Sequence, residues 1–271
     1  ARKVCQNAPM SSFSAQGILD ICPKELAGRL DITLFDELDS TNTYLKKLAR
    51  AGAEEGRIII ARRQSAGRGR LGRSFYSDAE GLYISVLIRP HMKAEGMVFV
   101  TAMAAVAMAR AIERTVDADA VIKWVNDIFV RGKKVCGILC ESAFGADALS
   151  EYVVIGAGVN ITEPFGGFPA DISAVAGALL PHGSGQELRS SLAAAFLEEL
   201  FGEYARLDSR SFLDEYRRRS MVTGKSVSVI SPTLARHGKA VAIDDDCRLV
   251  VRLDDGTTEH VSTGEISVRV D

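Results

Sequence analysis

The chain lacks the features that mark membrane-spanning and secreted proteins. No apolar run in its 271 residues approaches the roughly 18 residues that a transmembrane helix needs. The longest weakly polar stretch, Met97–Ala109, is rich in alanine and precedes several charged residues, which predicts a buried helix. Residues 1–14 lack the continuous apolar segment of a secretory signal peptide. These absences favour a cytoplasmic protein without a membrane partner.

Cysteine is scarce, with five residues scattered along the chain. Cys136 and Cys140 are four positions apart, but no second cysteine or histidine pair accompanies them, which disfavours a zinc site. An odd number of scattered thiols favours reduced cysteines rather than a disulfide framework.

Neither sign of charge is in excess, since 33 lysines and arginines face 35 aspartates and glutamates, for a formal net charge of −2. This balance argues against a surface built throughout for nucleic acid or anionic lipid. Hydrophobic residues make up 47% of the chain, which is enough for a sizeable core and excludes general disorder.

The order of predicted elements divides the chain into three parts. Residues 1–31 show little periodicity and are interpreted as an N-terminal tail or as a short docking helix around 24–30. Strands and helices alternate over 32–221, which predicts a mixed β-sheet with packed helices, an α/β (α+β) domain. Residues 222–271 contain five short β-prone runs separated by Asp-rich turns, which predict a small β-barrel.

The most distinctive stretch, Gln64–Phe75, is rich in arginine and glycine. Six arginines and no acid lie between Gly56 and Ser77. Guanidinium groups match the geometry of carboxylate and phosphate oxygens, and glycines allow the backbone to approach a ligand closely. The stretch predicts an anion-binding loop, although a solvated surface loop can have the same composition. Its spacing fits neither a dinucleotide fingerprint nor a P-loop.

Three further motifs end or interrupt predicted strands. Lys123–Asp127 ends one strand with asparagine and aspartate, residues that suit either a site or an ordinary turn. Lys134–Glu141 begins with a lysine and has Gly137 inside the strand, and Gly156–Asn160 contains two more glycines. A glycine inside a strand indicates close approach of a ligand or of another backbone. Each motif alone is ambiguous.

Together and in this order, the motifs resemble those of biotin protein ligases. The set consists of Ser40-Thr41-Asn42, Gln64 with Gly67-Arg68-Gly69-Arg70, Lys123-Trp124-x-Asn126-Asp127, Lys134-Val135-x-Gly137-Ile138-Leu139-x-Glu141 and Gly156-x-Gly158-x-Asn160. The similarity covers about residues 32–270. It implies a class II synthetase-like catalytic domain followed by an SH3-like barrel. Only 31 residues precede Ile32, which is too few for a winged-helix domain, so the ligase-only type without a DNA-binding domain is expected.

The resemblance implies an enzyme that activates biotin with ATP as biotinyl-adenylate and passes the biotinyl group to a lysine of a biotin carboxyl carrier protein. A carboxylate must then approach the α-phosphate of ATP, so cations, preorganised donors and Mg²⁺ are needed where the two anions meet. The implied partners are the carrier protein, biotin and ATP, with no DNA and no membrane. A homodimer is compatible with the resemblance.

The resemblance also assigns site residues. Those implied for biotin are Ser40, Thr41, Asn42, Gln64, Gly67, Arg68, Lys134 and Gly137. Those implied for catalysis are Arg68, Asn126, Asp127 and Lys134. Those implied for the nucleotide are Arg70, Arg73, Phe75, Asn126 and Asn160. Asp127 would either help to hold Mg²⁺ or accept the proton of the incoming lysine, and no set of metal ligands stands out.

The sequence departs from the family pattern at two positions. Val125 stands where the family has proline in Lys-Trp-Pro-Asn-Asp, and Phe75 stands where tryptophan often follows the arginine loop. Valine can adopt an extended backbone, and phenylalanine keeps a stacking face, so we expect little change in function.

Two other functions remain open from the sequence. A lipoate protein ligase would use the same adenylating chemistry with a different acyl pocket, although the loop Gln64–Phe75 favours biotin. A nucleic-acid-binding regulator would use the arginine cluster and the barrel. Against it, six acidic residues lie between Asp244 and Glu259, where they would repel phosphate backbones.

Overall fold

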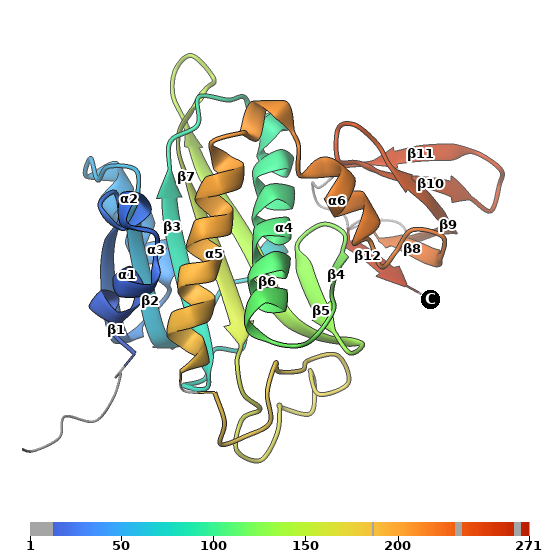
Figure 1. Ribbon diagram of the computed structural model, residues 1–271. Coiled ribbons are helices and arrows are strands. Elements are labelled where there is room, and N and C mark those ends of the chain that lie inside the picture. Colours follow the sequence, from blue (N-terminus) through green and yellow to red (C-terminus); the bar gives the residue numbers. More distant parts are fainter. Residues whose placement is uncertain (1–12, 186, 231–234, 263–266, 271) are drawn as a thin grey trace, which may run out of the picture.

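The computed structural model describes residues 13–185, 187–230, 235–262 and 267–270. Two units lie side by side, a larger body of helices and strands and a smaller all-β unit (Figure 1). The body contains a seven-stranded mixed sheet, and the smaller unit contains a five-stranded antiparallel sheet. This architecture confirms the predicted fold class, a mixed sheet with packed helices followed by a small barrel-like unit.

The strands of the body lie in the order β1-β2-β3-β7-β6-β5-β4. Their bounds are β1 Asp31–Leu38, β2 Arg57–Gln64, β3 Gly81–Ile88, β4 Ala120–Lys123, β5 Asp127–Val130, β6 Lys133–Phe144 and β7 Ser150–Asn160. Strands β1 and β2 are parallel, and the other neighbours are antiparallel. Strands β5 and β6 form the predicted hairpin, whose turn residues Arg131 and Gly132 both have positive φ.

Helices cover both faces of the sheet. Their bounds are α1 Ala15–Ile21, α2 Lys24–Ala27, α3 Thr41–Arg50, α4 Met97–Thr115, α5 Leu188–Tyr204 and α6 Leu213–Arg218. Helices α4 and α5 pack side by side on one face (Figure 1), and α3 packs on the other. Within the described residues, one helix, 94–115, is long and apolar enough to cross a membrane, but 67% of that window is buried inside the body. It is the core helix that the sequence predicts.

Two short helices precede β1, and the sequence predicts only the second of them. Helix α1 packs against α5 and β1, with Ile18 fully buried. Arg62 donates a hydrogen bond to the carbonyl oxygen of Phe13 (2.7 Å) and lies 5.1 Å from the centre of its ring. Residues 13–30 are therefore packed onto the body, which agrees with the docking helix and not with the tail among the two interpretations of the sequence. With seven residues, α1 is too short for its periodicity to stand out.

The five predicted β-runs of the smaller unit all form strands. They are β8 Ser226–Ile230, β9 Ala235–Ile243, β10 Leu249–Leu253, β11 Thr258–Val261 and β12 Ser267–Val270, in the order β11-β10-β9-β8-β12. The Asp-rich segments 244–246 and 254–256 form the predicted turns between them.

A cluster of ion pairs ties α4 to α5 and α6. Arg110 of α4 pairs with Glu203 of α5 (2.7 Å) and with Glu215 of α6 (2.5 Å). Arg219, which follows α6, pairs with Glu113 (2.6 Å) and Glu215 (2.7 Å). Burial raises the pKa of Glu215, but hydrogen bonds from Arg110 and Arg219 outweigh it and leave the pKa below its ordinary range. The Arg219 hydrogen bond is also the main reason why the pKa of Glu113 is lowered.

We expect Arg219→Met to destabilise the fold at neutral pH by about 3 kcal/mol, since it removes the ion pair of Glu113 and leaves the partly buried Glu215 with Arg110 as its close partner. Because both carboxyl pKa values are lower in the folded chain than in the unfolded one, the pairs stabilise the fold above the ordinary glutamate pKa. That stabilisation is lost as the pH falls through the lower, folded values. The difference in free energy of unfolding, measured with urea, should therefore shrink below about pH 4.

The neighbouring Arg218 provides a control, because its side chain is exposed and 3.8 Å from Glu215. We expect Arg218→Met to change the free energy of unfolding by less than about 0.5 kcal/mol. An Arg219→Met difference that stays constant between neutral and acid pH would show that the loss comes from packing and not from charge.

Candidate functional site

On the sheet face that α3 covers, the side chains become smaller beyond the N-terminus of that helix. Beneath α3 the face carries large apolar side chains, but further along the strands it carries small ones. Ser85 of β3 aligns with Gly156 of β7, and Tyr83 aligns with Gly158, which in turn aligns with Gly137 of β6. The three glycines leave a trough across the middle of the sheet, here called the glycine trough.

Each glycine of the trough leaves room for a neighbouring side chain. A Cβ atom on Gly156 would lie 2.1 Å from Oδ1 of Asn42. A Cβ on Gly158 would lie 2.6 Å from the ring of Phe75, and one on Gly137 would lie 3.1 Å from the same ring. Gly156 therefore admits the Asn42 amide, and the other two glycines admit the aromatic ring that occupies the trough.

The arginine-rich stretch folds as a small hairpin over the trough, here called the flap (residues 67–75). Its two arms are joined by backbone hydrogen bonds, including one from Phe75 N to Gly67 O (2.9 Å). A single 3-10 turn, η1 (Arg70–Gly72), forms the tip, where Leu71 has a left-handed backbone. The flap places its arginines above the sheet and its last residue in the trough.

A hydrogen-bond network lines the α3 side of the trough. The backbone N and the hydroxyl of Thr41 donate to Oε1 of Gln64 (2.9 and 3.1 Å), whose Nε2 donates to Ser77 (3.0 Å). The hydroxyl of Ser85 donates to Oδ1 of Asn42 (2.6 Å) and lies 2.8 Å from the Thr41 hydroxyl. Both amide side chains are thereby fixed in orientation, as a preorganised polar pocket requires.

A small pocket lies where this network meets the flap. Its lining residues are Ser40, Thr41, Asn42, Gln64, Arg68, Phe75, Gly137, Leu139, Gly156, Ala157 and Gly158. Its volume is about 30 Å³ because the Phe75 ring occupies the trough, so it holds water but no organic ring. A larger ligand enters only when the Phe75 ring moves out of the trough.

A second pocket of about 140 Å³ continues beneath the flap. Its lining includes Arg68, Arg70, Arg73, Phe75, Lys123, Trp124, Asn126, Asp127, Lys134 and Gly137. Lys134 pairs with Asp127 (2.7 Å), and its Nζ lies 5.9 Å from the Phe75 ring centre. Burial lowers the pKa of Arg70, although the nearby carboxylate of Asp127 acts to raise it. Since cations outnumber the carboxylate, this pocket favours an anion.

The turn that carries Asn126 is held to β6 and to the flap. Its Nδ2 donates to the carbonyl of Ile138 (2.7 Å), and Ile138 N donates back to Asn126 O (2.9 Å). Arg70 of the flap donates to its Oδ1 (3.3 Å). The asparagine therefore connects two walls of the second pocket, which an ordinary turn would not require.

The residues before Asn126 are held by the C-terminal part of the chain. The indole nitrogen of Trp124 donates to the carbonyl of Cys247 in the β9–β10 turn (2.9 Å). The hydroxyl of Tyr216 in α6 donates to the carbonyl of Val125 (2.8 Å). Both hydrogen bonds are buried, and the Trp124–Val125 peptide bond is cis. The C-terminal unit is thus joined directly to this turn.

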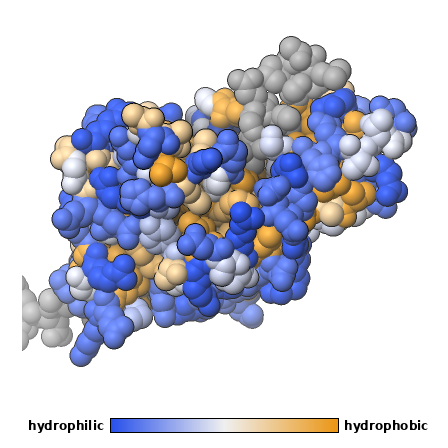
Figure 2. All heavy atoms as spheres, turned by 90° about the horizontal axis from the view of Figure 1, so that it is seen from above, coloured by the Kyte–Doolittle hydropathy of each residue, from blue (hydrophilic) through white to orange (hydrophobic). Residues whose placement is uncertain are grey.

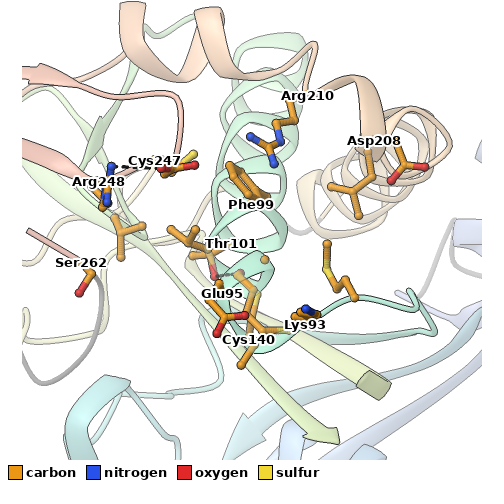
Figure 3. Close-up of a pocket in the computed structure, with 18 of the residues that line it drawn as sticks. Lys93, Glu95, Phe99, Thr101, Cys140, Asp208, Arg210, Cys247, Arg248 and Ser262 are labelled. Carbon is orange, nitrogen blue, oxygen red and sulfur yellow. Dashed lines mark hydrogen bonds and ion pairs between the residues drawn. The ribbon is translucent and has the colours of Figure 1, made fainter. Parts of the chain in front are cut away.

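A third cavity of about 830 Å³ separates the body from the C-terminal unit. Phe99 and Thr101 of α4, Cys140 of β6, and Cys247 and Arg248 of the β9–β10 turn face it from different sides (Figure 3). Hydrophobic residues are visible in the hollow between the two units (Figure 2). Because Arg70 and Leu139 line both this cavity and the second pocket, the cavity adjoins the flap.

The structure gathers most of the predicted site residues around the two smaller pockets and leaves two outside their linings. Gly67 lies at the base of the flap, where a Cβ atom would meet Ser77. Asn160 donates to the carbonyl of Gly177 (2.8 Å), in a segment that also pairs with the backbone of Lys134.

Several side chains that hold the site in place carry no role in the sequence-based assignment. Examples are Lys46, Ser77, Ser85, Glu141 and Tyr216. Alternation along β6 places Glu141 on the same face as Gly137, so the sequence pattern could have indicated Glu141. The other four come from ordinary helix, loop and strand positions that no short motif marks.

The described residues contain no group of three or more histidine, cysteine, aspartate or glutamate side chains able to hold a metal. Asp127 is the acid of the second pocket and lies next to the Asn126 amide. Magnesium at phosphates is usually held by one or two carboxylates together with phosphate oxygens, so this donor set fits a metal that arrives with a nucleotide.

Comparison with known proteins places the chain in a family. Residues 34–160 match the Biotin/lipoate A/B protein ligase family, and residues 222–269 match the Biotin protein ligase C terminal domain. Over 249 residues the chain is 30% identical to the biotin--[acetyl-CoA-carboxylase] ligase of Mycobacterium tuberculosis, which covers 89% of this chain and 90% of that protein. The chain belongs to the biotin protein ligase family. It is therefore an ATP-dependent ligase that acts on biotin.

Other relatives agree with this membership. The bifunctional ligase/repressor BirA of Bacillus subtilis is 29% identical over 226 residues, which are 82% of this chain and 69% of that protein. The solved biotin protein ligase of Aquifex aeolicus in complex with biotin and ATP has the same fold, with a TM-score of 0.73 and 23% identity, and the match covers 89% of this chain and 99% of that one.

In this biotin protein ligase we expect Tyr216→Phe to leave the Val125 carbonyl unpaired and to loosen the turn before Asn126. The kcat of the biotin-dependent reaction should fall about tenfold, as misplacement of site groups does. The KM for biotin should stay within about twofold, since the Thr41–Gln64 network does not contact this turn.

Tyr152→Phe is the matched control, because Tyr152 is also buried and its hydroxyl accepts a hydrogen bond from Arg50, away from the pockets. Both variants should lose about 1 kcal/mol of stability. Equal kcat values for the two variants would contradict the proposal that the Tyr216 hydroxyl fixes the turn before Asn126.

Proposed function

We propose that the chain forms biotinyl-adenylate in the two pockets beneath the flap and transfers the biotinyl group to a lysine of a biotin carboxyl carrier protein. The observation that carries this proposal is the order in which neutral and cationic side chains follow one another along the trough. Neutral donors and acceptors predominate at one end and cations at the other, and Arg68 lines both pockets. Biotin has the same order of groups, a neutral ureido head and an anionic carboxylate tail.

At the neutral end, the proposal assigns the ureido head to the small pocket. A ureido group presents N–H donors and a carbonyl acceptor, and the Ser40 and Thr41 hydroxyls with the Gln64 and Asn42 amides can satisfy both. The glycine trough gives the bicyclic ring a flat floor once the Phe75 ring has moved out. Gly67 would act at the base of the flap, outside this pocket.

At the cationic end, the proposal brings the biotin carboxylate to the α-phosphate of ATP. Two anions approach each other there, so preorganised positive groups lower the barrier. Lys134, Arg68 and Arg70 are assigned this role, and Arg73 would contact the nucleotide. A carboxylate oxygen attacks the α-phosphorus, the bond to the bridging oxygen breaks, and pyrophosphate leaves.

In the second step the amine of the carrier lysine attacks the carbonyl carbon of the mixed anhydride, and AMP leaves. The amine must be neutral, so a proton has to go to a base. Asp127 is the carboxylate beside Lys134 and is assigned this proton, or alternatively a bond to Mg²⁺ that accompanies ATP. Asn126 would keep Asp127 and Arg70 in place.

The proposal also gives Phe75 and Asn160 roles at the nucleotide. Phe75 lies between the two pockets, so its ring could stack on the adenine after leaving the trough. Asn160 would act through the segment at Gly177, which it holds against the backbone of Lys134.

The names of the relatives favour biotin over lipoate, although the first family description covers both. Transfer of radiolabelled biotin, and not of lipoate, to a carrier domain tests this choice. We also place the protein in a reducing compartment, the cytoplasm, because the four described cysteines are free thiols. A homodimer is a further prediction, tested by sedimentation with and without biotin.

We expect Lys134→Ala to reduce biotin-dependent pyrophosphate release by at least about a hundredfold, because it removes a preorganised cation from the meeting point of two anions. Lys133→Ala is the control, since Lys133 is exposed and donates to the carbonyls of Ser173 and Ala174. Normal pyrophosphate release by folded Lys134→Ala would contradict the assignment.

We expect trypsin to cut the flap at its arginines in the free protein and to cut it at least about tenfold more slowly with biotin and ATP, since ligands order a loop that closes over them. Arg131, at the tip of the β5–β6 hairpin, provides an internal control whose cleavage should not change. Flap cleavage that is unaffected by the two ligands would count against closure.

A further inference from the structure

Glu141 is the last residue of the Lys134–Glu141 motif, and the proposed reaction gives it no part. It lies on β6, on the same face as Leu139 and Gly137, and aligns with Val154 of β7. Its side chain is 18% exposed and is absent from the lining of the small pocket. It therefore lies just behind the pocket wall.

Three side chains, two from α3 and one from the flap, converge on this carboxylate. Nδ2 of Asn42 donates to Oε2 (3.0 Å), while Lys46 of α3 (2.5 Å) and Arg68 of the flap (3.1 Å) both contact Oε1. Asn42 and Arg68 line the small pocket, so Glu141 touches two of its walls. It joins α3, β6 and the flap at one point.

The carboxylate is charged at neutral pH despite its partial burial. Burial raises the pKa of Glu141, but hydrogen bonds from Lys46 and Asn42 and the charge of Arg68 lower it below its ordinary value. Lys46 and Arg68 contact the same oxygen, so without the negative charge they would repel each other. Arg68 would then be displaced, because its side chain is 47% exposed and that of Lys46 only 18%.

We propose that Glu141 is a positioning residue that holds the Arg68 guanidinium at the small pocket before biotin binds. The proposal rests on the proposed function of that pocket. Ordering an arginine side chain is entropically unfavourable, and an anchor that orders it in the free protein removes this term from binding. Asn42, bound by the same carboxylate, is kept in the correct amide orientation.

The test is the pair of Michaelis constants for pyrophosphate release. Glu141→Gln keeps the shape of the side chain but loses the charge, and we expect the KM for biotin to rise about tenfold, the size of a lost charge-assisted hydrogen bond. The KM for ATP should stay within about twofold, because four other cations line the second pocket besides Arg68. Trypsin should also cut the ligand-free flap faster.

Glu37→Gln is the matched control, because Glu37 of β1 pairs with Arg63 (3.9 Å) and both side chains are more than half exposed. It should change neither constant. A double-mutant cycle separates positioning from a general structural effect. In an Arg68→Ala background, Glu141→Gln should raise the KM for biotin by less than about twofold, since the residue it acts through is gone.

Two results would overturn the proposal. One is an unchanged KM for biotin in folded Glu141→Gln, and the other is the same rise in both the wild-type and the Arg68→Ala backgrounds. Should the melting temperature show that Glu141→Gln is unfolded, Glu141→Asp retains the charge with a shorter reach and should give a smaller rise in the KM for biotin. A wild-type protein without biotin-dependent pyrophosphate release would instead refute the proposed function itself.

Discussion

The site depends on the absence of side chains at the centre of the body's sheet. Strands β6 and β7 carry glycines at positions 137, 156 and 158, and the pairing register places two of them side by side. A sheet face that is packed under α3 becomes open at these positions without any break in its hydrogen bonding. The Asn42 amide and the Phe75 ring both enter the space so created. A rigid, flat floor is therefore combined with a movable cover.

The overall charge balance conceals that positive and negative side chains are concentrated in different parts of the chain. The net charge of −2 sums an arginine-rich flap and an acid-rich β9–β10 turn. Asp245 is held by Arg217 of α6 at the contact of the two units (2.5 Å), and Asp244 is held by Arg248 within the turn itself (2.8 Å). The flap arginines lie over the second pocket, so positive charge is concentrated where carboxylate and phosphate would meet.

The strands, the helix α4 and the small β-unit could be predicted because their patterns are long or strongly periodic. Helix α1 could not, since seven residues give too little periodicity. Among the site residues, Ser40, Gln64 and Lys134 belong to short motifs and were found by resemblance. Tyr216 and Lys46 were not, because they reach the site from helices whose local sequence is ordinary. Only the tertiary packing brings them to a carbonyl oxygen or a carboxylate.

The chain contains a single tryptophan, and it lies at the contact between the two units. The Trp124 indole is buried, its N–H is bound to the Cys247 carbonyl, and its backbone leads directly into the Asn126–Asp127 turn. All intrinsic indole fluorescence of the chain therefore originates from this contact. A change in emission reports the local environment where the C-terminal unit meets the turn, without a label and without contributions from other tryptophans.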